Sequence, residues 1–497
     1  MSSSDSPKTP AVRLAVVTLA AISIQGYHLG VDDAAIYIPG IKKAADPDLY
    51  PFGTEFFASH ADLTLFPKLV GGLAQFTGIP VDHVIFACHI TGLFLLLLAA
   101  WHIVSLYFKS PAARWCGVSV LAAVLGIPVA GTALTIFDPY VTSRTLSAPC
   151  ILFAVAALLA NRPLRAVALL VCAASIHVQM SVYAAALMGC YLVTARRNTA
   201  HIGAFQVSPG FLLVLPFVFE FTPAQGWARE ALYSRTYFFI SQWRWYEWIG
   251  ALAPIATLWL FSRVNFRAVT PAFHQSAAAM VMLGVGSTLA AVLLATVPRL
   301  ENYTRLQPMR SFHLIYLVFF LMLGGLGGEY LLRTSILRWT ALFFPLGVSL
   351  WAVQHAAFPS SAHIELPGAA SENPWTEAFL WIRRNTPKDA IFALDPRYLV
   401  LRDEDMHGFR AIAERSQMAD EIKDSGVVSL FPYLADSWHT QVKALAGWND
   451  FRFTDYRRLA HEFGVGWVVI RREPVAGLSC PYQRGGISVC HIQVEPP

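Results

Sequence analysis

Residues 164–195 read LRAVALLVCAASIHVQMSVYAAALMGCYLVTA, and the way in which this stretch crosses a lipid bilayer decides the topology of the chain. A simple membrane span needs roughly 20 apolar residues, so a single helix over the whole stretch would be too long. The middle of the stretch holds Ser175, His177, Gln179 and Ser181. We therefore predict two short helices that meet at SIHVQMS, because a broken helix is tolerated at membrane depth where it lines a cavity.

The composition of the whole chain indicates a polytopic membrane protein. The 497 residues are 55% hydrophobic and only 14% charged, with a mean hydropathy of +0.48, whereas a soluble domain carries about a quarter charged residues. The formal net charge of +5 is too small to suggest nucleic acid as a partner. The lipid bilayer is the expected partner instead. No Walker loop, dinucleotide fingerprint or zinc pattern of paired cysteines occurs in the sequence.

Nine further apolar runs are candidate membrane spans. They cover 12–29, 84–108, 115–131, 147–160, 204–221, 246–262, 272–297, 311–331 and 337–357. With two helices in 164–195, the chain has about eleven spans, and the long connections 30–80, 222–245 and 298–310 lie with the C-terminus opposite the N-terminus. Without the break, everything after residue 195 changes sides. Arginine positions do not decide between the two versions, because both leave arginines on each side.

The C-terminal part, residues 363–497, is predicted to be a small α/β domain outside the membrane, following a membrane domain over 1–362. TEAFLWIRRNTP and TDYRRLAHEFG have helical patterns, and DAIFALDP and VGWVVIRR have strand patterns. Cys480 and Cys490 flank PYQRGGISV, whose two glycines predict a hairpin turn. A disulfide between the paired strands would place the C-terminus in an oxidising compartment, which favours the broken helix.

Two adjacent aspartates, Asp32 and Asp33, follow the first apolar run in the stretch YHLGVDDAAIYIPG (27–40). A carboxylate beside a partly desolvated surface can act as a general base toward a hydroxyl or an amine, and a pair could hold a divalent cation. The alternative is that both cap a helix end and face water. The residues that follow mix isoleucines with Lys42 and Lys43, which is typical of a helix on a membrane surface and favours a functional pair.

A short first helix, an acidic pair just beyond it and a long first outer loop with surface helices resemble the GT-C superfamily of membrane glycosyltransferases. The segments WIRRNTPKDAIFALDP and FTDYRRLAHEFGVGWVVI are similar to the periplasmic portions of bacterial GT-C-like proteins. The resemblance implies a sugar donor linked to a polyprenyl phosphate and a catalytic base in the acidic pair. The first acid often has that role, which points to Asp32. Asp33 lies four residues before Tyr37, a spacing that would also fit, so the choice stays open.

Arginines on the outer side are candidates for holding the phosphate of such a donor, because one guanidinium can hold two phosphate oxygens. The candidate substrate-binding arginines are Arg144, Arg244, Arg305 and Arg310. For Arg144 the alternative is interfacial anchoring. For arginines of the two later connections the alternative is ion pairing with Glu230, Glu247 and Glu301.

Three histidines and Tyr37 complete the candidate substrate site. His60, close to Asp62, could reach a substrate or a metal, or could belong to an ordinary solvated turn. His177, at the predicted break, could be functional or could satisfy backbone carbonyls that the break frees. His28 lies one turn before Asp32 and could hydrogen-bond to it.

The leading hypothesis is an inverting glycosyltransferase of the bacterial inner membrane, with a cytoplasmic N-terminus and a periplasmic C-terminal domain. It would move a sugar from a polyprenyl-phosphate donor to an acceptor at the outer face. No cofactor is implied beyond a divalent cation at the acidic pair. One alternative is a transporter or flippase, in which the broken helix would line a pathway. The other is a non-catalytic scaffold, whose function would survive the loss of both aspartates.

Overall fold

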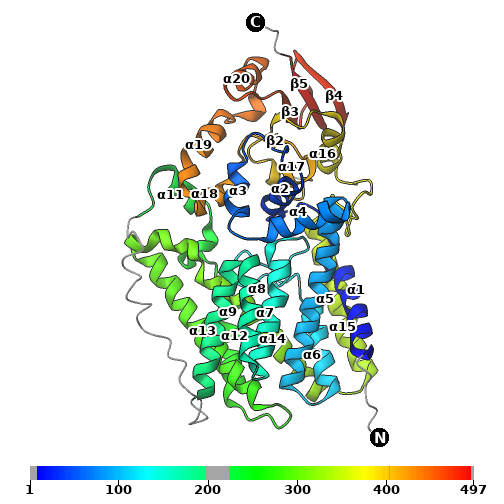
Figure 1. Cartoon of the computed structure of the whole chain (residues 1–497), viewed down its shortest axis with the longest axis vertical. Helices are drawn as coiled ribbons and strands as arrows, with labels where there is room; N and C mark the ends of the chain where they lie inside the picture. Colours follow the sequence, from blue (N-terminus) through cyan, green and yellow to red (C-terminus); the bar gives the residue numbers. More distant parts are fainter. Residues whose placement is uncertain (1–7, 197–222, 402, 494–497) are drawn as a thin grey trace.

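The chain is a bundle of apolar helices that carries a small α/β domain at one end (Figure 1). The structure, a computed structural model, describes residues 8–196, 223–401 and 403–493. Short helices of the first long connection lie between the bundle and the C-terminal domain (Figure 1). The predicted fold class, a polytopic α-helical membrane protein with a small C-terminal α/β domain, is confirmed.

The bundle contains helices at ten of the eleven predicted spans, and the remaining one, 204–221, lies outside the described residues. The helices are α1 (Lys8–Gln25), α5 (Val81–Tyr107), α6 (Pro111–Ala123), α7 (Ser143–Leu159), α8 (Pro163–Ile176), α9 (Val178–Arg196), α12 (Trp245–Arg263), α13 (Pro271–Thr296), α14 (Phe312–Gly327) and α15 (Ile336–Ala357). Among the described residues, five helical segments are long and apolar enough to cross a membrane by length and composition alone. They are Val81–Tyr107, Val178–Ala195, Pro271–Thr296, Pro298–Leu332 and Ile336–Ala357.

The predicted break in the helix over 164–195 is confirmed at a single residue. Helix α8 ends at Ile176, helix α9 begins at Val178, and His177 between them has an extended backbone with φ −152° and ψ 96°. The backbone N–H of Leu65, from the first long connection, donates to the carbonyl of Ser175 at 2.8 Å. A carbonyl near the break is therefore satisfied by the first long connection, as buried backbone groups require.

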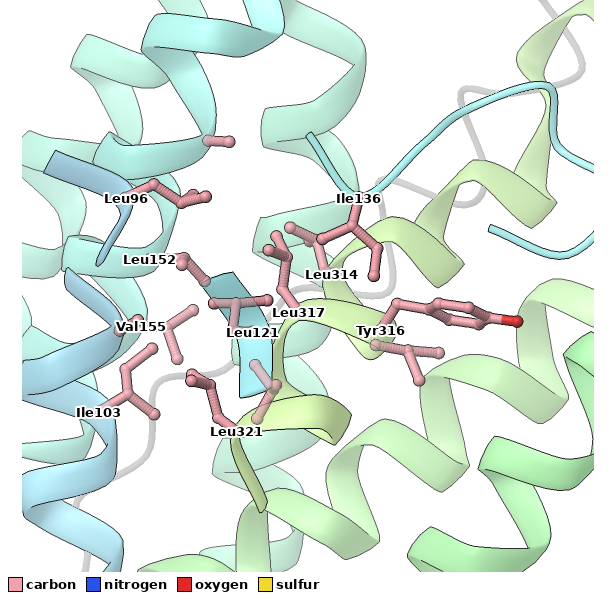
Figure 2. Packing of buried hydrophobic residues seen from close by; sticks show 14 of the residues in the cluster. Leu96, Ile103, Leu121, Ile136, Leu152, Val155, Leu314, Tyr316, Leu317 and Leu321 are labelled. Carbon is pink, nitrogen blue, oxygen red and sulfur yellow. The ribbon is translucent and has the colours of Figure 1, made fainter. Parts of the chain in front are cut away.

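Helices α5, α6, α7 and α14 contribute a large part of the hydrophobic core of the bundle. Figure 2 shows aliphatic side chains of these helices pointing toward one another. They include Leu96, Ile103, Leu121, Leu152, Val155, Leu314, Leu317 and Leu321. Helices α6 and α14 approach closely. A Cβ atom added to Gly324 of α14 would lie only 3.0 Å from the carbonyl oxygen of Cys116 in α6. Small residues at such crossings let backbones pack tightly in membrane bundles.

The first long connection forms three helices, α2 (Ala34–Ala45), α3 (Glu55–Ala61) and α4 (Phe66–Thr77). The prediction that the lysine-containing helix lies on a membrane surface is wrong. The Lys42 side chain is buried, and its Nζ lies 2.7 Å from Asp82 and 2.9 Å from Glu414, so α2 packs inside the protein. Helix α4 instead exposes an apolar face, which contains Leu69, Leu73 and Phe76.

The two later connections are also ordered. The second contains α11 (Gly226–Tyr233) and the 3₁₀ turns η1 (Thr236–Phe238) and η2 (Ile240–Gln242). The third is not an open loop, because η3 (Pro298–Leu306) and η4 (Pro308–Ser311) lead directly into α14, whose far end continues as the π-turn η5 (Gly328–Leu332).

The C-terminal domain contains a five-stranded sheet of order β2-β1-β3-β5-β4. The strands are β1 (Ile391–Ala393), β2 (Ser416–Gln417), β3 (Trp467–Ile470), β4 (Leu478–Arg484) and β5 (Ile487–Ile492), with β2, β1 and β3 parallel and β4 and β5 antiparallel. The helices are α16 (Pro374–Asn385), α17 (Phe409–Ala413), α18 (Asp424–Leu430), α19 (Ala435–Ala444) and α20 (Phe453–Phe463), with 3₁₀ turns η6 (Tyr398–Val400), η7 (Pro432–Leu434) and η8 (Trp448–Asp450). The predicted disulfide joins Cys480 to Cys490 across the β4–β5 hairpin, whose turn is Gly485-Gly486.

Candidate active site

The acidic pair opens into a cavity of about 250 Å³ between the bundle and the C-terminal domain. The first long connection, the start of α7, the later connections and α18 all contribute to its lining. The polar residues of the lining are Asp32, Asp33, Tyr37, His60, Arg144, Arg235, Tyr237, Gln307, Arg310 and Lys423. Six residues predicted from the sequence are thus brought together: both aspartates, Tyr37, His60, Arg144 and Arg310.

The backbone around the acidic pair is fixed by the C-terminal domain. The N–H of Asp32 donates to the carbonyl of Met406 at 3.0 Å, and the N–H of Gly408 donates to the carbonyl of Gly30 at 2.9 Å. Asp32 itself adopts the left-handed region, with φ of 52°, and Asp33 follows as the residue preceding α2. This conformation costs a non-glycine residue about 1–3 kcal/mol. The two backbone hydrogen bonds to the C-terminal domain offset this cost and hold the turn that presents both carboxylates.

Asp32 accepts hydrogen bonds from two groups. The Tyr140 hydroxyl donates to Oδ2 at 2.9 Å, and the Lys423 ammonium donates to Oδ1. Burial and the nearby carboxylates Asp32 and Asp138 raise the pKa of Tyr140 well above its usual value, so its hydroxyl stays protonated and donates. About 35% of the Asp32 side chain is nevertheless exposed to the cavity, which leaves room for a substrate hydroxyl beside the carboxylate.

Asp33 lies between two cations. Its Oδ2 lies 3.3 Å from Nη2 of Arg144, and its Oδ1 lies 3.4 Å from Nζ of Lys423. Arg144 is in turn fixed by Asp138, which accepts from Nη2 at 2.7 Å and from Nε at 3.2 Å. Burial alone would raise the pKa of Asp33, but Lys423 and Arg144 outweigh it and hold this pKa well below the usual value. Asp33 is therefore ionised throughout the physiological range.

Two further arginines of the lining, Arg235 and Arg310, form no ion pair with a carboxylate of the described residues. Nη2 of Arg235 donates to the Ile422 carbonyl and, at 2.6 Å, to Oγ of Ser425, while the Arg310 guanidinium lies 5.7 Å from the centre of the Tyr237 ring. Within the described part of the chain, the buried Nε atoms of both arginines lack a hydrogen-bond partner. Such groups are ready to bind an anion.

The charge of the lining favours an anionic ligand. Its cations are Arg144, Arg235, Arg310 and Lys423, and its carboxylates are Asp32 and Asp33. Burial lowers the pKa of His60 to about 4, so this histidine is neutral near pH 7, and its Nε2 lies 2.9 Å from the Tyr37 hydroxyl. Asp138, which pairs with Arg144 from outside the lining, is a third carboxylate, so four cations face three carboxylates. The remaining positive charge lies in a partly desolvated space, where it would attract phosphate oxygens.

Four predicted residues do not line this cavity. The predicted contact of His28 with Asp32 is wrong, because the His28 ring stacks on Phe358 and its Nδ1 lies 3.5 Å from Glu365. His177 is buried at the helix break, Arg244 is exposed at the start of α12, and Arg305 donates to Asn302 at 2.8 Å. Their roles in substrate binding stay predictions.

Sequence reasoning missed Lys423 and Tyr140. Lys423 lies 391 residues after Asp32 in the chain, so no local pattern connects the two. Tyr140 gives a weak signal, since it lies in the same outer connection as Arg144 and Asp138. Within the described residues, no group of three or more acidic, histidine or cysteine side chains is placed to hold a metal. The acidic pair, with Lys423 and Arg144 beside it, does not fit a divalent cation.

No family model matches the chain, and no curated protein matches it. Among solved structures, the chain is similar to the crystal structure of ArnT from Cupriavidus metallidurans in the apo state. The similarity covers 97% of each chain, with a TM-score of 0.39 and 13% sequence identity. A likeness at this level carries no conclusion about activity.

Proposed function

We propose that the chain is a membrane glycosyltransferase that takes a sugar from a polyprenyl-phosphate donor. The observation that supports this proposal is that one cavity holds a partly exposed carboxylate, Asp32, together with the guanidinium groups of Arg235 and Arg310, whose Nε atoms have no hydrogen-bond partner among the described residues. Transfer from a sugar phosphate needs both elements: a base for the acceptor and cations for the leaving phosphate.

In the proposed reaction, the Asp32 carboxylate takes the proton of the acceptor hydroxyl or amine. The acceptor atom forms a bond to the anomeric carbon while the bond from that carbon to the phosphate oxygen breaks. The electron pair of the broken bond leaves with the phosphate, whose charge Arg235 and Arg310 stabilise. Direct displacement of this kind inverts the configuration at the anomeric carbon. Asp33, held ionised by Arg144, places negative charge beside the carbon as positive charge develops on it.

The proposed location is the outer face of the bacterial inner membrane, with the C-terminal domain in the periplasm and the N-terminus in the cytoplasm. Two observations support it. The Cys480–Cys490 disulfide is typical of an oxidising compartment. Helix α4, whose exposed apolar face contains Leu69, Leu73 and Phe76, ends shortly before the long apolar helix α5 begins and is suited to lie in the outer lipid surface.

The test is complementation of a deletion strain with wild type, Asp32→Asn or Asp33→Asn, each at a verified level of expression. We expect Asp32→Asn to lower transfer by roughly 10²–10⁴-fold, as loss of a general base does, and to cause the lipid-linked donor to accumulate. Asp62→Asn, at an exposed aspartate of the same connection, is the matched control and should behave as wild type.

Both lipid-linked sugars and surface glycans are measured in these strains. If Asp32→Asn and Asp33→Asn both restore wild-type glycans, the pair is only a helix end and the proposal is wrong. A flippase would instead change the leaflet in which the donor resides without forming a new glycoside, so the detection of a glycosylated acceptor separates these two activities.

A further inference from the structure

Lys423 belongs to the C-terminal domain, yet its side chain contacts both carboxylates of the acidic pair. The ammonium donates to Oδ1 of Asp32 and lies 3.4 Å from Oδ1 of Asp33. Only 10% of the Lys423 side chain is exposed. A domain remote in sequence therefore supplies a counter-ion to the carboxylate that is proposed to act as the base.

The backbone of Lys423 is anchored, whereas its ammonium is not. Oδ1 of Asp420 accepts the N–H groups of Ile422 at 2.8 Å and of Lys423 at 2.5 Å. The carbonyl of Asp420 accepts from Nε1 of Trp438 at 2.9 Å, which ties this turn to α19. The lysine ammonium is a point charge at the end of a flexible four-carbon stem, so it can change partners while its Cα atom stays in place.

The other cation that touches the acidic pair cannot move in this way. Arg144 is held by Asp138 through two nitrogen atoms, at 2.7 and 3.2 Å, and its side chain is buried. If Lys423 leaves, Asp33 keeps its contact with Arg144, whereas Asp32 keeps only the hydrogen bond from Tyr140. The departure of Lys423 would therefore leave Asp33 with a cation beside it and Asp32 with a neutral hydrogen-bond donor.

The anion-binding groups of the cavity lie next to Lys423. The guanidinium of Arg235 contacts the Ile422 carbonyl and the Ser425 hydroxyl, which flank Lys423 in sequence. Arg310 lines the same cavity. A phosphate bound by Arg235 would thus lie on the side of the cavity from which Lys423 reaches the acidic pair, and would compete with Asp32 for the ammonium.

We propose that Lys423 is a displaceable counter-ion, which moves from Asp32 to the phosphate when the donor binds and thereby frees Asp32 to accept the acceptor's proton. This inference rests on the proposed function. The Lys423 ammonium occupies Oδ1 of Asp32, so its departure opens this oxygen to the acceptor's proton. Acceptor deprotonation is then confined to the complex that already contains the donor, and Asp33 remains an ionised, non-basic neighbour.

The experiment measures binding of farnesyl phosphate to the purified full-length protein in nanodiscs, with farnesol as the uncharged reference. Four proteins are compared: wild type, Lys423→Met, Asp32→Asn and the double variant. We expect Lys423→Met to weaken binding about tenfold and Asp32→Asn to tighten it about tenfold, because Lys423 no longer has to leave a partner. In the Lys423→Met background, Asp32→Asn should tighten binding by no more than about twofold.

The inference is wrong if the effects of Lys423→Met and Asp32→Asn on the free energy of farnesyl phosphate binding are additive. If Asp32→Asn tightens binding equally in both backgrounds, the carboxylate acts on the phosphate through space and Lys423 is not shared. Lys443→Met, at an exposed lysine of α19, is the matched control and should leave the affinity unchanged. Lys423→Arg should retain phosphate binding, and Lys423→Gln replaces the methionine variant if the latter does not fold. Wild-type protein that binds farnesyl phosphate no better than farnesol would refute the proposed function itself.

Discussion

Arg410 and Asp424 form a buried ion pair beside the acidic pair, and its removal should destabilise the chain strongly. Nη1 and Nη2 of Arg410 donate to the two carboxylate oxygens of Asp424, at 2.8 and 2.9 Å. The two side chains are 6% and 2% exposed. Asp424 directly follows Lys423, so the pair also fixes the start of α18 and the backbone from which the Lys423 side chain extends.

Arg410→Leu would leave the Asp424 carboxylate buried without its cation. Breaking a buried pair in this way costs about 3–5 kcal/mol, because the remaining charge is desolvated and uncompensated. The double variant Arg410→Leu/Asp424→Leu removes both charges and should recover most of that loss. Arg484→Leu breaks the exposed pair with Glu377, which are 71% and 43% exposed, and should cost no more than about 1 kcal/mol.

The assay is unfolding of the purified full-length protein followed by tryptophan fluorescence, with phosphate binding measured on the same samples. We expect Arg410→Leu to lose farnesyl phosphate affinity together with stability, since Lys423 loses its support. If Arg410→Leu is no less stable than Arg484→Leu, or if the double variant is less stable than the single one, then the pair is not desolvated and the reasoning fails.

Two other predictions concern the contacts around the site. Burial would lower the pKa of His407, but the Glu365 carboxylate, 3.0 Å away, raises it above the usual value. A raised histidine pKa gives stability that is complete below the unfolded pKa of about 6.5 and is lost as pH rises through the folded value. The unfolding temperature should therefore fall as pH rises above about 6.5 in wild type but not in Glu365→Gln, and equal slopes would contradict this. Gly92→Ala would place a Cβ atom 2.6 Å from the Thr145 carbonyl oxygen and should cost about 1–3 kcal/mol by separating α5 from α7, whereas Gly72→Ala, with open space around it, should cost nothing measurable in the same unfolding assay.

Features encoded by neighbouring residues could be predicted from the sequence. The helix break at His177 follows from the length of the apolar stretch and the polar residues at its centre. The hairpin of Cys480 and Cys490 follows from two glycines between two short strands. In each case the determining interaction is local, and its pattern survives in a single sequence without knowledge of the rest of the fold.

Features that depend on distant partners could not be predicted in the same way. Lys42 gives its helix an amphipathic pattern, but the ammonium is buried because Asp82 and Glu414 come from other parts of the chain to meet it. His28 is close to Asp32 in sequence, yet the ring turns to Glu365. Charged side chains in a partly desolvated interior take the partner that the tertiary fold brings closest, and sequence separation does not report that choice.

The same principle explains why the candidate site needs the C-terminal domain. Arg144 forms its ion pairs with Asp33 and Asp138, so it offsets charge on Asp33 and leaves Asp32 to another cation. The remaining compensation comes from Lys423, and the turn that presents Asp32 is held by the carbonyl of Met406. Without this domain, Asp32 would lose both Lys423 and the backbone contact that holds its turn, whereas Asp33 would keep Arg144. The domain therefore positions the carboxylate that we propose as the base, and it also supplies the counter-ion that we propose to leave that carboxylate when phosphate binds.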